Sequence, residues 1–166
     1  IELPATTLAS SCYYNMFNGC TSLTTAPELP ATTLVQGCYG YMFKGCTSLT
    51  TAPALHATTL VSNCYYNMFN GCSKLNYIKM LATDISADYC LDDWVSGVAS
   101  SGTFVRDENM LSLPIGESGI PKGWVVKKQG ENGIQDVYDS LYFTIEALED
   151  GLTVKLSVNA CYYRKN

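Results

Sequence analysis

CYYNMFNGCTSLTTAPELPATTL, residues 12–34, decides the fold because the chain uses it again and again. It returns as CYGYMFKGCTSLTTAPALHATTL at residues 38–60, and its first half returns as CYYNMFNGCSKL at residues 64–75. Successive copies begin 26 residues apart, the interval from Cys12 to Cys38 and from Cys38 to Cys64. Such self-similarity at one period is typical of a solenoid, in which each unit packs on its neighbour.

Each unit predicts one short helix and one short strand. Cys12, Met16 and Cys20 fall at i, i+4 and i+8, the spacing of an apolar helix face. Gly19 suits the left-handed residue that ends a helix, and Gly45 and Gly71 repeat it in the next units. The β-branched residues 21–26 then favour a strand. The sequence therefore predicts an α/β solenoid of the leucine-rich-repeat type, with about 26 residues per unit.

Seven of the eight cysteines occupy two columns, which are Cys12, Cys38, Cys64 and Cys90, and Cys20, Cys46 and Cys72. Equivalent positions in successive units of a solenoid usually form a core ladder, so we expect all seven to be buried free thiols. A zinc site is not expected, because paired Cys-x-x-Cys spacing is missing and the sole histidine, His56, stands at the position of Pro30. Cys161 lies outside the columns.

The run MFNGCTSLTTAPELPATTL resembles the BspA-like leucine-rich repeats of bacterial surface proteins, in which Met-Phe-x-Gly-Cys-x-x-Leu recurs at about this length. The resemblance covers residues 1 to about 97. It implies a right-handed solenoid exported to the bacterial cell surface, with no shared catalytic residues. Repeats of this kind also occur in phage-encoded surface proteins. Since residues 1–4 correspond to residues 27–30, we expect the chain to be a piece of a longer array.

The fourth unit departs from the pattern. Leu81 and Cys90 keep register with Leu55 and Cys64, and Trp94 stands where the third unit has Met68. A large aromatic suits the last core layer, so we expect it to be buried under a cap. The aspartates of this unit recur at i+4 and indicate either a solvated face, which we favour, or a calcium site; they are Asp84, Asp88 and Asp92.

We expect three parts along the chain: a solenoid over 1–97, a β-rich C-terminal cap over 98–128, and a linker with a β-hairpin over 129–166. Asp150-Gly151 between two strand-like runs is the hairpin signal. An isolated hairpin is marginal in water, so this part is expected either to dock on the solenoid or, as we favour, to begin a further β domain.

The composition narrows the classes of function. A net charge of −5 argues against nucleic acid as a partner. No apolar run reaches the length of a membrane span, so no insertion is expected. No catalytic or nucleotide-binding motif is present, and no cofactor or metal site is expected. These observations favour a non-enzymatic protein that is a monomer.

The tyrosines give the candidate ligand contacts. Tyr13, Tyr39 and Tyr65 form one column, and beside it the extra tyrosine moves by one place in the second unit, giving Tyr14, Tyr41 and Tyr66. Neighbouring columns cannot both face the interior, so part of the tyrosine surface should be exposed. We expect a cell-surface module that binds a host protein or a glycan through a Thr/Ser/Tyr-rich face. The alternative is a structural spacer in a bacterial or phage surface protein.

Overall fold

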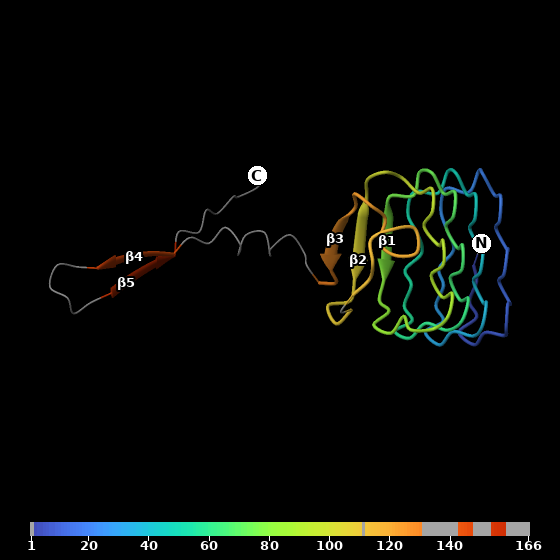
Figure 1. Cartoon of the computed structure of the whole chain (residues 1–166), viewed down its shortest axis with the longest axis horizontal. Coiled ribbons are helices and arrows are strands. Elements are labelled where there is room, and N and C mark those ends of the chain that lie inside the picture. The colour runs from blue at the N-terminus through green and yellow to red at the C-terminus, as the bar shows by residue number, and fades with distance from the viewer. Residues whose placement is uncertain (1, 111, 131–142, 148–153, 159–166) are drawn as a thin grey trace. The chain divides into compact units, whose positions relative to one another are not determined.

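The computed structural model describes residues 2–110, 112–130, 143–147 and 154–158. Contacts divide the chain into two compact units, Ile1–Gln129 and Gly130–Asn166. The first holds the repeats, which wind one beside the next as far as a small sheet (Figure 1). The expected solenoid and cap therefore fall within one compact unit.

The expected α/β solenoid, with one helix and one strand in each unit, is wrong, because the described residues before Tyr77 form no strand and the sheet of the first compact unit has only three short parallel strands. No residue that the structure describes is helical. The stretches 9–20, 35–46, 61–72 and 87–98 instead form what we call turn ribbons, each a run of overlapping four-residue tight turns. In the first ribbon, Cys12 N donates to Ala9 O at 3.2 Å and Met16 N donates to Tyr13 O at 3.2 Å.

The remaining N–H groups of each ribbon bond to the next unit. Tyr13 N donates to Cys38 O at 3.0 Å, and Phe17 N donates to Met42 O at 2.9 Å. Across the first three ribbons, even-numbered residues donate inside their own ribbon, and odd-numbered residues donate to the following one. The ribbon thus satisfies its backbone polar groups without a helix, as burial requires.

Left-handed residues at every fourth position explain why no helix forms. In the first ribbon they are Ser11, Asn15 and Gly19, with φ of 54°, 61° and 74°. A left-handed residue interrupts a right-handed helix but fits the third place of a type II tight turn. Glycine and asparagine tolerate this conformation best, and they hold most of these positions in the first three units. Gly45, expected to have a positive φ, has one of 72°, inside a ribbon rather than at a helix end.

Outside the ribbons, parallel β-pairing joins each of the later units to the next. Strand β1 (Tyr77–Met80) pairs with β2 (Thr103–Arg106), and β2 pairs with β3 (Val125–Lys128). A bridge joins Leu55 to Met80, so Met80 rather than Leu81 takes the core position of Leu55. The expected alignment of Leu81 with Leu55 is therefore wrong by one residue. The cause is that Tyr77 to Met80 is one residue shorter than the segment it pairs with, Thr51 to Leu55.

The core is a set of columns that run through the stacked units. Met42 and Met68 are fully buried, and so are the cysteine, phenylalanine and leucine columns of the middle units. Successive phenylalanines stack nearly parallel, with Phe17 and Phe43 centroids 5.5 Å apart. Equivalent side chains repeat at each unit and touch the copies above and below, so the repeat itself generates the packing.

Trp94 closes the core, as its position in the sequence predicted. It is fully buried, its ring meets Phe104 edge to face at 6.3 Å, and its Nε1 donates to Gly119 O at 2.9 Å. Glu117 O and Ser118 Oγ accept backbone N–H groups of the fourth ribbon. The segment around residues 117–119 thus replaces the next ribbon.

The cysteine prediction is correct for five residues and wrong for two. All seven repeat cysteines are free. Cys38, Cys46, Cys64, Cys72 and Cys90 are buried, whereas Cys12 and Cys20 are exposed. The first unit packs on a neighbour on one side only in the described structure, which leaves these two thiols uncovered.

The second compact unit contains β4 (Phe143–Ala147) and β5 (Val154–Val158), which pair antiparallel. This pairing agrees with the two strand-like runs read from the sequence. Asp150-Gly151, the expected tip of the hairpin, and Cys161 lie outside the described residues.

Candidate tyrosine surface

The ribbons send neighbouring tyrosines to opposite sides. Tyr39 and Tyr65 are buried in a stacked column with Tyr13. The other column reaches the surface: Tyr14 is 44% exposed, and Tyr41 and Tyr66 are half-buried. The sequence predicts both columns but not which of them is exposed. That depends on the backbone conformation, because tight turns and a helix direct neighbouring side chains differently.

The three candidate residues lie together although they do not share one repeat position. The Tyr14 and Tyr41 ring centroids are 5.3 Å apart at an interplanar angle of 65°, and those of Tyr41 and Tyr66 are 5.2 Å apart at 71°. Edge-to-face contacts of this kind suit the aromatic quadrupole and add about 0.5–1.5 kcal/mol per pair. We call Tyr14, Tyr41 and Tyr66 the tyrosine strip.

Gly40 makes the strip possible. A Cβ atom at Gly40 would lie 2.8 Å from Cε2 and 2.9 Å from Cδ2 of Tyr14, closer than real contacts allow. The ring of Tyr14 therefore occupies the space that a side chain at residue 40 would fill. In the second unit the tyrosine shifts to residue 41, whose φ of 55° places it at the left-handed position of the ribbon.

A neighbouring cation and partial desolvation change the electrostatics of Tyr41, the central residue of the strip. Lys44 Nζ lies 5.1 Å from the centroid of the Tyr41 ring, a cation–π geometry. The pKa of Tyr41 is raised to about 12, chiefly by desolvation. A side-chain hydrogen bond with Tyr66 and electrostatic repulsion from Tyr66, Tyr14 and Asp93 raise it further. Tyr41, at the centre of the strip, is therefore uncharged at physiological pH, and the Lys44 cation lies near its ring.

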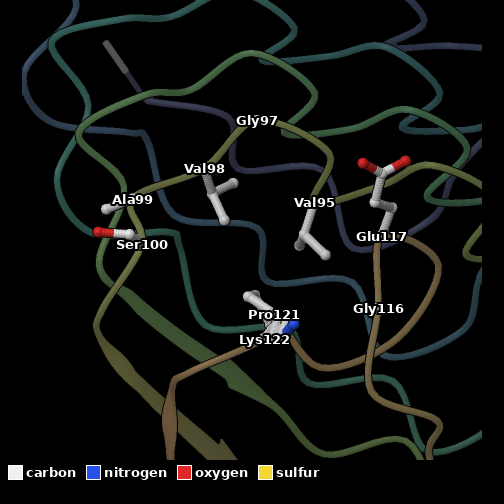
Figure 2. A pocket seen from close by; sticks show the side chains of 9 residues that line it. All are labelled: Val95, Gly97, Val98, Ala99, Ser100, Gly116, Glu117, Pro121 and Lys122. Carbon is white, nitrogen blue, oxygen red and sulfur yellow. The ribbon is translucent and has the colours of Figure 1, made fainter.

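Two of the hollows elsewhere on the first compact unit are lined by residues of the repeats. One of about 250 Å³ on the strand side is lined by polar and small residues of the first two units, namely Thr24, Thr25, Ala26, Glu28, Thr50, Thr51, Ala52 and Pro53. The other, of about 300 Å³, lies between the fourth ribbon and the cap, where Val95 and Val98 point into it (Figure 2). Each lining holds one carboxylate and at least one hydroxyl, Glu28 with the threonines and Glu117 with Ser100, but no hydrogen bond pairs them as a general base and a nucleophile among these residues.

Neither metal ligands nor a membrane span are found in the part of the chain that is described. Its histidine, cysteine and acidic residues form no group of three that could hold a metal ion. Asp84 bonds to Ser86, whose hydroxyl lies 2.7 Å away, and this lowers the pKa of its carboxyl. The described residues also lack a helix with the length and apolar character that crossing a bilayer requires.

Sequence reasoning found the three tyrosines but missed Gly40 and Lys44. Gly40 was visible only as an interruption of a tyrosine column. The signal was present, since the extra tyrosine moves by one place in the one unit that has this glycine.

Comparison of the chain with protein-family models, curated proteins and solved structures finds no match.

Proposed function

We propose that the protein is a non-enzymatic interaction module that binds a protein or a glycan through the tyrosine strip. The supporting observation is the strip itself, three contiguous rings partly open to solvent on successive units. Tyrosine offers large contact area for little loss of side-chain entropy, and its hydroxyl can hydrogen-bond to a polar ligand. The resemblance of the repeat to BspA-like proteins adds a location at the bacterial cell surface to the proposal.

The test is an array of glycans and host surface proteins probed with the intact chain, followed by affinity measurement on any ligand found. The variant Tyr14→Ala/Tyr41→Ala/Tyr66→Ala removes the strip. The matched control is Tyr77→Ala/Tyr89→Ala, which removes two exposed tyrosines outside the strip. We expect the first variant to weaken binding at least ~10-fold, equivalent to about 1.4 kcal/mol, and the control to bind normally.

Equal loss in both variants would mean that binding depends on tyrosine content or on general folding rather than on the strip. A folded wild-type chain that binds nothing on the array would favour the alternative function, a spacer. The observation behind this alternative is the hydrogen-bonded ladder between successive ribbons, which would make the stacked units stiff. A spacer would tolerate removal of the strip in every functional assay.

A further inference from the structure

Asn67 has a buried side chain whose amide is left without a partner. Apart from aromatic residues and cysteines, it is the only buried residue with a polar side chain in the described part of the chain, and 6% of its surface is exposed. In the first unit, Asn15 at the same position accepts from Asn18 Nδ2 at 2.8 Å. In the third unit, Asn70 donates to Asp93 O instead, and the Asn67 amide has no hydrogen-bond partner among the described residues. Buried polar groups are normally paired, so this amide needs an explanation.

The two polar atoms of this amide reach solvent rather than the core. Among the described residues, the one side-chain polar atom that is fully buried without a partner is the Tyr39 hydroxyl. Oδ1 and Nδ2 of Asn67 are therefore both accessible from outside, although nearly all of the residue is covered. The amide thus offers an outside molecule one acceptor and two N–H donors.

These donors and acceptors open on the face of the tyrosine strip. Asn67 directly follows Tyr66 and holds the repeat position of Tyr41, 26 residues earlier. Asn67 and Tyr41 have left-handed backbones, with φ of 53° and 55°, so their side chains leave their ribbons on the same face. On this face the rings of Tyr41 and Tyr66 meet with centroids 5.2 Å apart. The amide is therefore placed beside two aromatic rings of the strip.

Two opposite charges lie near the same rings. Lys44 Nζ lies 5.1 Å from the centroid of the Tyr41 ring. The exposed Asp93 holds the repeat position of Asn67 in the fourth unit and acts electrostatically on Tyr41. One cation and one anion offset each other, so this surface favours a neutral ligand over a charged one. The carboxylate can only accept hydrogen bonds, so it favours a ligand that carries donors.

This arrangement belongs to the interior of the stack and does not depend on the first unit. The ribbons that hold Tyr41 and Tyr66 each hydrogen-bond to the ribbon before and the ribbon after them. The ribbon that holds Asp93 is covered by the cap, where Asp93 N donates to Ser118 Oγ at 3.0 Å. The amide and its surroundings are thus set by packed neighbours on both sides.

We propose that the ligand of the tyrosine strip is a neutral oligosaccharide and that Asn67 recognises its hydroxyl groups. This inference rests on the proposed function, because it names the class of ligand that the strip binds. A sugar combines an apolar C–H face, which packs on an aromatic ring, with hydroxyls that both donate and accept. Neighbouring hydroxyls accept from Nδ2 and donate to Oδ1 of the one amide, and a further hydroxyl donates to Asp93. A protein partner would be anchored chiefly by buried apolar and charged side chains, which this neutral polar surface does not match.

The experiment probes the intact chain with immobilised neutral oligosaccharides, uronic-acid oligosaccharides and unglycosylated surface proteins, and measures affinity for the probe that binds best. Asn67→Gly removes the amide and keeps a residue that tolerates positive φ. The matched control is Asn63→Gly in the same unit, where φ is 57° and the amide already donates to Ser62 Oγ at 3.0 Å. We expect Asn67→Gly to weaken binding of a neutral oligosaccharide by ~3- to 10-fold and Asn63→Gly by less than ~2-fold. Thermal unfolding of the two variants should be alike.

A second measurement uses the wild-type chain alone. The side-chain N–H signals of Asn67 in nuclear magnetic resonance spectra should shift when the neutral oligosaccharide is added, while those of Asn63 stay in place. Unmoved Asn67 signals in the presence of a bound oligosaccharide would overturn the role of this residue, even if a variant failed to fold.

The outcomes separate this inference from the proposed function. Binding only of unglycosylated proteins or of uronic-acid oligosaccharides, lost when the three tyrosines are replaced by alanine, would overturn the choice of ligand and leave the proposed function standing. Binding of a neutral oligosaccharide that survives the loss of the three tyrosines would place it outside the strip and overturn the inference. Binding of none of the probes would count against both.

Discussion

The ring of Tyr14 lies over the backbone of Gly40, one unit further along the stack, where a Cβ atom would stand 2.8 Å from Cε2 of the ring. The glycine and the aromatic residue therefore act as one feature in two units. The shift of the next tyrosine to residue 41 brings its ring against Tyr14 at 5.3 Å. The continuity of the tyrosine strip depends on this contact.

Gly40→Ala should displace the Tyr14 ring and destabilise the protein by on the order of 1 kcal/mol, because residue 40 is buried and its new methyl group meets the ring. Chemical denaturation measures the free energy of unfolding. In a Tyr14→Ala background the same change should cost much less, since the obstacle is gone. Equal costs in the two backgrounds would show that the alanine clashes with the backbone of the third unit instead.

Trp94→Ala should destabilise the protein by about 3–5 kcal/mol, from lost burial and the cavity left between the fourth ribbon and the cap. Hydrogen exchange resolved by segment should show loss of protection in the fourth and third units before the first. Trp94→Phe keeps a ring against Phe104 but loses the bond from Nε1 to Gly119 O, so it should cost less. Uniform exchange along the repeats in Trp94→Ala would contradict this account.

Tyr39→Phe should leave stability unchanged or raise it by up to ~1 kcal/mol. The hydroxyl of Tyr39 is buried without a hydrogen-bond partner, and an unsatisfied buried polar group is unfavourable. Its ring contacts with Tyr13 and Tyr65 remain in phenylalanine. The control is Tyr13→Phe, where the residue is only half-buried and removal of the hydroxyl should change little. Clear destabilisation by Tyr39→Phe would indicate a bridging water or an altered ring position.

Stability should fall as the solution becomes alkaline. Burial raises the pKa of the Cys72 thiol from 9.0 to about 12, so the unfolded chain loses this proton at lower pH than the folded chain. The contribution of this thiol is complete below pH about 9 and is lost as pH rises toward 12. One such group changes the free energy of unfolding by about 1.4 kcal/mol per pH unit across that window.

Cys72→Val tests this dependence, because Val98 holds the equivalent position in the fourth unit. The variant should keep near-normal stability at pH 7 and lose stability less steeply than the wild type between pH about 9 and 11, measured by urea unfolding with thiols kept reduced. The other buried thiols, whose pKa values are also raised, remain in the variant, so part of the pH dependence of the free energy of unfolding should persist. Identical slopes for variant and wild type would show that Cys72 does not titrate differently in the folded chain.

The sequence by itself determined the period of 26 residues, the columns that stack, the left-handed glycines and the aromatic residue that closes the core. These follow from identity between units, because equivalent residues of a repeat must take equivalent places. It also placed Tyr14, Tyr41 and Tyr66 as candidates. It could not assign which tyrosine column is outside, because that depends on the local backbone geometry.

Only the tertiary structure decided between a helix and a turn ribbon. Apolar residues at Cys12, Met16 and Cys20 fit the helix period of about 3.6 residues, and they fit tight turns repeating every four residues equally well. Within one isolated unit, the odd-numbered N–H groups of the ribbon would lack partners. The neighbouring unit supplies those partners, as when Tyr13 N donates to Cys38 O, so stacking stabilises a backbone that local sequence alone does not select.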